Sequence, residues 1–226
     1  MAVAWASAHR RPRSIVGNDH MTQTLLDKRL YDVLNAVALK KMATAAAVSE
    51  IVNLDTDQVR DIFAELADSD YLALMGETAL PTDASGPVLV DSAAVIYGQI
   101  RTDPSVLQVA DKFEDVNSRF LRTMSSWQQI EVAGRKLAND HSDSVYDAKV
   151  ISTIERLVSR LEGLLEALSE KDARFRTYIG RFERSLEKVD AGDIAFVSDP
   201  TRDSVHNVWF EFHEDLLRTL GRARKE

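Results

Sequence analysis

The sequence predicts a mainly α-helical protein, with an N-terminal winged helix-turn-helix-like domain followed by an antiparallel four-helix bundle. Three observations support this fold class. Apolar residues recur at helical spacing through most of the chain after residue 103. Residues 22–83 show the order helix, short helix, turn, helix and hairpin, which is typical of a winged helix. The stretch PTDASGPV between these regions concentrates residues that break secondary structure.

These observations divide the 226 residues into four parts. We expect a flexible tail over 1–21, the winged-helix-like domain over 22–83, a linker with a connecting helix over 84–102, and the helical bundle over 103–222. The tail lacks the order of a secretory signal, because its short apolar part precedes its arginines, and Met21 begins a sequence that resembles a protein start. No apolar run reaches the roughly 18 residues that a membrane span needs. We therefore expect a cytoplasmic protein that does not span a membrane.

Three helices and a hairpin are expected in the first domain. Apolar spacing predicts a helix over residues 25–41, which two lysines close, and TAAAVSEIVN follows as a short second helix. Asp55 suits the N-cap of a third helix, and Gln58 three residues later completes a capping-box pattern. YLALMGETALPTD then predicts two short strands around Gly76.

Four longer helices are expected in the second region. Asp103 and Pro104 predict a helix start, and further helices begin near Ser144, Phe175 and Val205. Their apolar stripes are Val106, Val109, Phe113, Val116, Phe120 and Trp127; Val150, Ile154, Leu157, Leu161, Leu164 and Leu168; Phe175, Ile179, Phe182, Leu186 and Val189; and Val205, Val208, Phe212, Leu216 and Leu220. Short connections between such helices predict an antiparallel bundle. The apolar segment Val88–Ile100 could pack on this bundle or pair with a second subunit in a homodimer.

The charge of the first domain argues against DNA binding. The chain carries a net charge of −8, and residues 22–95 account for most of it, with five basic and twelve acidic residues. If the third helix read DNA, the reading residues would be Thr56, Gln58 and Arg60. Asp57 and Asp61 lie next to these residues and would repel phosphates. The expected wing LMGETALPTD has no Lys or Arg to neutralise phosphates. A protein partner is therefore favoured, and DNA binding is kept as the alternative.

Polar residues concentrate in two interhelix segments and in the last helix, and these define the candidate ligand site. The candidates are Asn139, Asp140, His141, Asp143, Tyr146, Asp147, Arg202, Asp203, His206, Trp209 and Glu211. Structural roles explain many of them at least as well. Asp143 or Ser144 would cap one helix and Asp203 or Ser204 another. Trp209 would anchor the core and donate its indole N–H to a group such as a nearby carboxylate.

The histidines do not have the spacing of a metal site. His206 and His213 lie two helical turns apart, roughly 10.5 Å, whereas zinc-binding helices place two histidines four residues apart. We expect His213 to pack beside the apolar stripe and His206 to approach the Asn139–Asp147 loop. The chain has no Cys, no phosphate-binding Gly loop, no GxSxG elbow and no dinucleotide fingerprint. The sequence therefore predicts no catalytic residue, metal or cofactor, and an enzyme using His141, His206 or His213 as a base is the least favoured class.

The pattern NDHSDSVYD followed by GDIAFVSDPTRDSVHNVWFEFHEDLLRTLGR resembles an actinobacterial-type module that accompanies phosphoenolpyruvate-utilising, pyruvate phosphate dikinase-like proteins. The resemblance covers roughly residues 105–222, with a winged-helix-like portion before it. Matching positions are Asn139, Asp140, His141, Asp143, Tyr146, Asp147, Gly192, Asp193, Pro200, Asp203, Ser204, His206, Val208, Trp209, Phe210, Glu211, His213, Glu214, Asp215 and Leu216. The chain lacks the nucleotide-grasp and swivelling-histidine segments of a dikinase, so the resemblance implies an accessory or regulatory role.

We therefore expect a non-catalytic interaction or regulatory protein, accessory to a dikinase-like enzyme. The alternative is a winged-helix transcriptional regulator whose helical domain senses a ligand or dimerises.

Overall fold

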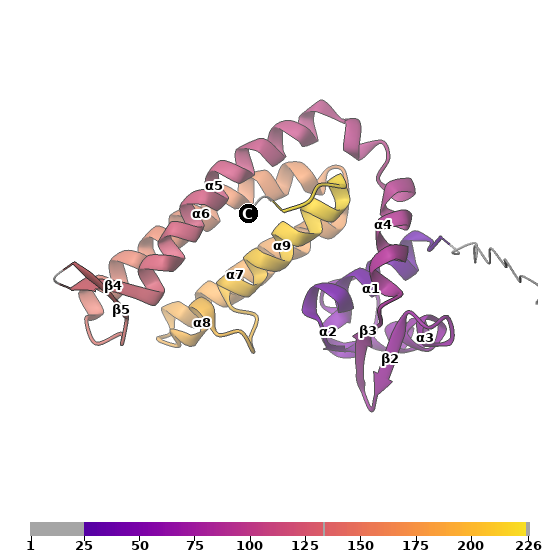
Figure 1. The fold of residues 1–226 in the computed structure, drawn as a ribbon, viewed down its shortest axis with the longest axis horizontal. Coiled ribbons are helices and arrows are strands. Elements are labelled where there is room, and N and C mark those ends of the chain that lie inside the picture. Colours follow the sequence, from indigo (N-terminus) through magenta and orange to yellow (C-terminus); the bar gives the residue numbers. More distant parts are fainter. Residues whose placement is uncertain (1–24, 133, 225–226) are drawn as a thin grey trace, which may run out of the picture.

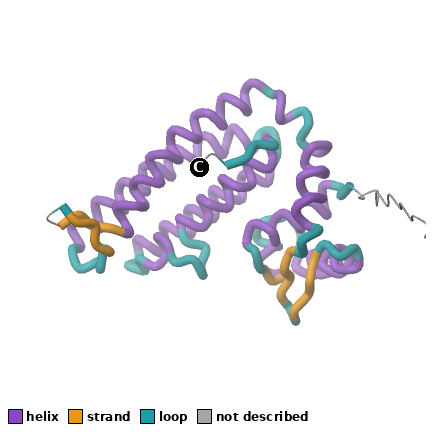
Figure 2. Tube along the Cα trace, viewed as in Figure 1, coloured by secondary structure: helices purple, strands orange, loops and turns teal. Residues whose placement is uncertain are grey.

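The computed structural model describes residues 25–132 and 134–224, and within them the protein is mainly helical, with two small sheets (Figures 1 and 2). The tail predicted over 1–21 lies outside the described residues. Among the helices of the described part, none combines the length and the apolar character that crossing a bilayer requires.

The N-terminal elements follow the predicted order. They are α1 (Lys28–Lys40), β1 (Ala43–Thr44), α2 (Ala45–Ser49), α3 (Thr56–Asp68), β2 (Leu72–Met75) and β3 (Thr78–Pro81). The first helix starts later than predicted because Asp27 is its N-cap and accepts a hydrogen bond from Leu30 N–H at 2.9 Å. Asp55 and Gln58 form the predicted capping box of α3. Strand β1 was not predicted, and it completes an antiparallel sheet in the order β1-β3-β2.

Helix α4 (Ser85–Ile96) lies where a linker with a connecting helix was predicted, and it contributes to the N-terminal core. Its side chains Val88, Leu89 and Ala93, together with Tyr97, belong to the same buried cluster as α1, α3 and the sheet. In the PTDASGPV stretch, Pro81 ends β3, residues 82–84 form the connection, and Ser85 begins α4. We call residues 25–102 the N-terminal unit; it ends with the 3₁₀ turn η1 (Ile100–Thr102).

Residues 103–224, here called the helical unit, contain the second hydrophobic cluster. The unit contains α5 (Pro104–Gln128), β4 (Gln129–Val132), β5 (Arg135–Ala138), α6 (Ser144–Ser169), η2 (Ala173–Phe175), α7 (Arg176–Asp190), α8 (Ala195–Ser198) and α9 (Val205–Leu220). Asp103 caps α5 and Ser204 caps α9, both at predicted positions.

The β4–β5 hairpin corrects the prediction that the chain is helical throughout this region. Gln129 leaves α5 in an extended conformation, and Gly134 has a φ of 77°, which favours glycine. The described residues of β5 are exposed, so the hairpin projects from one end of the α5–α6 pair (Figure 1).

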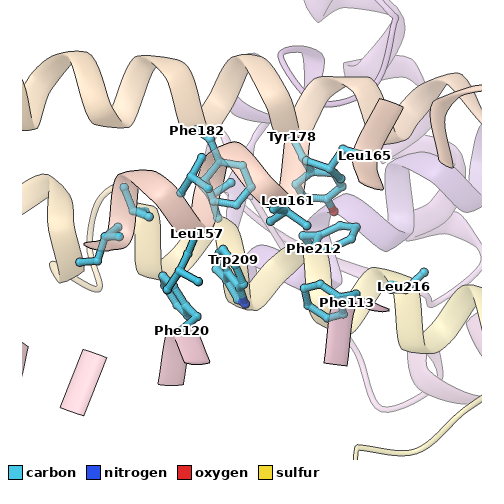
Figure 3. Packing of buried hydrophobic residues seen from close by; sticks show 14 of the residues in the cluster. Phe113, Phe120, Leu157, Leu161, Leu165, Tyr178, Phe182, Trp209, Phe212 and Leu216 are labelled. Atoms are coloured by element: carbon cyan, nitrogen blue, oxygen red, sulfur yellow. The ribbon is translucent and has the colours of Figure 1, made fainter. Parts of the chain in front are cut away.

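Aromatic side chains fill the centre of the helical unit (Figure 3). Trp209 stacks on Phe120 with ring centroids 3.9 Å apart, and Phe113 meets Phe212 edge to face at 5.0 Å. Trp209 is thus the predicted anchor, but its indole N–H donates to the amide oxygen of buried Asn117 at 3.0 Å instead of to a carboxylate. The predicted stripes are shifted in places, since Val109, Val116, Leu164, Ile179 and Leu186 are only partly buried.

Candidate functional site

The two units meet through polar groups, and Asp215 on α9 is the centre of the first network. Its buried carboxylate accepts hydrogen bonds from Asn35 Nδ2 at 2.8 Å, Tyr178 OH at 3.1 Å and Arg174 Nε at 3.2 Å. Asn35 belongs to α1, Arg174 to η2 and Tyr178 to α7. One carboxylate therefore joins the N-terminal unit to three parts of the helical unit.

The Arg174 guanidinium extends this network toward the N-terminal unit. It lies 4.6 Å from the ring centre of Tyr97 and donates to the Tyr97 hydroxyl and to Thr219 Oγ1. Asp172 lies 3.3 Å from it and Asp32 3.8 Å. Burial raises the pKa of Tyr97, which keeps its hydroxyl protonated. The first network therefore consists of paired charges and of neutral hydrogen-bond donors.

A second network joins α1 to α7 and α9. Arg181, only 1% exposed, pairs with Asp203 at 2.9 Å and with Glu211 at 2.7 Å, and Lys40 of α1 lies 2.8 Å from Asp203 and 3.4 Å from Glu211. Burial by itself would raise the pKa of Asp203, but the hydrogen bonds and charges of Arg181 and Lys40 outweigh it and hold that pKa well below its usual range. Two cations and two carboxylates balance here.

A cleft of about 690 Å³ lies beside the first network. Leu39, Ile51, Val52, Ile96 and Ile100 give it an apolar wall from the N-terminal unit. Lys171, Arg174, Arg176 and Tyr178 give it a polar wall from the helical unit. Its size and mixed lining suit a small organic ligand. Because the walls come from both units, a ligand bound there would contact both at once.

The predicted Asn139–Asp147 residues form a local network. Asn139 Nδ2 donates to Asp147 Oδ1 at 2.9 Å and to Trp127 O at 3.0 Å, and His141 Nδ1 lies 2.9 Å from Asp147 Oδ2. Asp143 caps α6, and the Tyr146 hydroxyl donates to Ser126 O at 2.9 Å. These contacts anchor the segment that follows β5 to the start of α6.

Asp140 and Arg202 take part in local contacts. Asp140 accepts a hydrogen bond from Ser142 N–H at 3.1 Å. Arg202 pairs with Asp193 at 3.0 Å and with Asp199 at 3.4 Å, at the surface.

The structure places the candidates from the last helix in separate groups. Asp203 and Glu211 belong to the second network, whereas His206 packs beside Phe120, with ring centroids 6.3 Å apart. The loop lies two turns further along α5, where His141 meets Trp127 at 4.2 Å. We expected His206 to approach the Asn139–Asp147 loop, but no contact between them is found among the described residues. His213 is buried against Phe113, as expected.

Sequence reasoning missed Asn35, Lys40, Arg174, Arg181 and Asp215 as interface residues. Arg174 and Arg181 are largely or fully buried, and each pairs with a carboxylate of α9. A pattern existed for Arg181, since it follows Tyr178 and precedes Ser185 at helical spacing on the buried face of α7. Asn35 and Asp215 lie 180 positions apart, so no local pattern links them.

No metal-ion constellation occurs among the residues that the structure describes. They contain no group of three His, Cys, Asp or Glu side chains placed to hold an ion. The hydrogen bonds of the His141–Asp147 pair go to Asn139, and none of those found in the described ranges joins it to a hydroxyl nucleophile. Comparisons with protein-family models, curated proteins and solved structures found no match to this chain.

Proposed function

We propose that this chain is a non-catalytic interaction or regulatory protein, whose N-terminal winged-helix-like unit binds a protein partner through α3. The observation that carries the proposal is that the three residues predicted to read DNA, Thr56, Gln58 and Arg60, are engaged in contacts within the unit. Arg60 pairs with Asp57, the Gln58 side-chain oxygen accepts from Asp55 N–H at 3.1 Å, and Thr56 Oγ1 lies 3.3 Å from Ser49 Oγ. All three side chains already have partners within the unit.

The exposed face of α3 favours a basic protein surface. Asp57, Asp61, Glu65 and Asp68 are exposed and recur at steps of three and four, so they form one acidic stripe. Arg60 is the only basic residue of the helix. A phosphate backbone would be repelled by this stripe, whereas lysines and arginines of a protein partner would be attracted.

The partner class comes from the sequence resemblance. A module that resembles companions of dikinase-like proteins would act as an accessory to such an enzyme. The polar interface supports a regulatory role, because the cleft and both ion networks connect the unit that carries α3 to the helical unit. The helical unit would set the orientation in which α3 is presented.

Binding measurements with a dikinase-like enzyme from the same source test this proposal. We expect the purified chain to bind the enzyme, and Asp61→Lys with Asp68→Lys to weaken binding about tenfold or more, since two attractive contacts become repulsive. The matched control is Asp91→Lys with Asp111→Lys, which makes the same charge change on α4 and α5 and should leave binding intact. Equal binding by the α3 variant and the wild type would contradict the proposal.

The alternative, a DNA-binding regulator, is favoured by the order of helices and hairpin. Titrating a fluorescent duplex of random sequence distinguishes the two functions. We expect no binding at about 150 mM salt, because the stripe adds repulsion and the wing adds no cation. A salt-dependent shift that Gln58→Ala and Arg60→Ala abolish would establish the alternative instead.

A further inference from the structure

A basic groove lies between α5 and α6, in a protein that is acidic overall. The groove has a volume of about 550 Å³, and five cations line it without any carboxylate: Arg119, Arg122, Lys149, Arg156 and Arg160. All five are exposed, and none forms an ion pair with another described residue. Arg174 and Arg181 of the same unit are paired with carboxylates, whereas the five groove cations are not paired within the described part of the chain, so this groove retains uncompensated positive charge.

The groove matches a surface of the chain itself. On α6, Lys149, Arg156 and Arg160 lie on one face over eleven positions, which is roughly 16.5 Å at 1.5 Å per residue. The acidic stripe of α3, from Asp57 to Asp68, also spans eleven positions and therefore the same length. The two helices thus present opposite charges with the same extent.

We propose that α3 of a second copy of this chain docks in the α5–α6 groove. Within one copy the two surfaces cannot meet, because α3 lies at the opposite end of the long axis from the β4–β5 end of α5 and α6 (Figure 1). Two copies in antiparallel orientation place each α3 against the groove of the other. Two reciprocal contacts close a dimer with two-fold symmetry.

Apolar side chains near both surfaces add area to this contact. Leu74 and Met75 are exposed on β2, which packs beside α3. Val145 is exposed at the start of α6, next to the groove residue Tyr146. A docked helix would cover such side chains while its carboxylates face the groove cations.

The proposal rests on the proposed function in taking α3 as a protein-binding surface, and it names a copy of this chain as one partner. It extends that function, since a dimer formed through α3 would hide the surface that another partner needs. Self-association would then compete with enzyme binding.

Sedimentation velocity of charge-reversed chains tests the dimer. We expect the wild type to dimerise at about 50 mM salt and to dissociate at about 500 mM, because salt screens exposed charges. Lys149→Glu with Arg156→Glu should make the groove acidic and raise the dissociation constant about a hundredfold, as should Asp61→Lys with Asp68→Lys on α3. Arg29→Glu with Lys112→Glu is the control for the groove variant, with the same charge change outside the groove and no expected effect.

Mixing the two reversed variants gives the sharpest result. Each variant alone opposes like charges, but an equimolar mixture pairs each reversed surface with a complementary one, so the dimer should return. A wild type that stays monomeric at low salt, a groove variant that still dimerises, or a mixture that stays monomeric would overturn the proposal. Binding of duplex DNA to a monomeric wild type, lost in the groove variant, would also overturn it and assign the groove to a nucleic acid.

The two proposals fail separately. A monomeric wild type whose α3 variant loses the enzyme would leave the proposed function standing and remove the dimer. A dimer that mixing restores, without any binding to the enzyme, would do the reverse.

Discussion

The buried carboxylate of Asp215 shows how much depends on one residue. It neutralises Arg174 and accepts hydrogen bonds from two other side chains, while only 2% of its surface is exposed. Bringing such charges out of water is costly, so each needs its partner once the chain has folded.

Replacing Asp215 with Ala should lower the free energy of unfolding by about 3–5 kcal/mol, because Arg174 would stay buried without its central partner. Urea denaturation measures this change. Asp111→Ala is the control, since Asp111 forms an exposed pair with Arg222 at 3.6 Å and should cost about 0.5 kcal/mol or less. Equal effects of the two substitutions would show that the network is solvated.

Two histidines of α9 should make stability depend on pH. Burial lowers the pKa of His206, and burial also lowers that of His213 although Glu114 acts in the opposite direction. The unfolded chain then binds more protons than the folded chain near and below the ordinary His pKa of about 6.5, so stability should fall as the pH drops from about 7 to 5. Urea midpoints across this range should show a smaller decrease for His206→Gln with His213→Gln, and parallel curves would contradict the prediction.

At the scale of elements, Asn139 holds the β4–β5 hairpin and the loop after it to α6. Asn139→Ala would leave buried Asp147 without one donor and Trp127 O without another, and should cost about 1–3 kcal/mol. Thermal and urea unfolding measure the loss. Lys136→Ala in the exposed strand β5 is the control and should change stability by less than about 0.5 kcal/mol. A negligible effect of Asn139→Ala would leave this loop free for the binding role that the sequence suggested.

Elements with local signals could be predicted from the sequence. Asp55 and Gln58 lie three positions apart, and Asp103 and Pro104 are adjacent, so each signal is local. The structure has both helix starts at these places. Strand β1 is only two residues long and exists through its pairing with β3, from Ala43 to Ala79, so no local pattern reveals it. The candidate site was harder for the same reason, because its contacts join α1 to α9 across most of the chain.

At the scale of the whole molecule, the polar interface should make the two units unfold together. Trp127 and Trp209 both lie in the helical unit, so in a Trp5→Phe chain their fluorescence reports on that unit, while circular dichroism reports on all helices. We expect the two unfolding curves to coincide. Lys40→Ala with Asp215→Ala should separate them, and separate curves in the Trp5→Phe chain before those changes would contradict the prediction.

The charged character of the interface has a consequence for motion. The two hydrophobic clusters have separate buried members, and of the residues that the structure describes only the partly buried Ile100 packs against both. Moving the units apart would therefore expose carboxylates and guanidinium groups, which water solvates well, to solvent. Both hydrophobic clusters would stay buried. We therefore expect that a form of this protein with its two units apart would expose little additional apolar surface and would not aggregate.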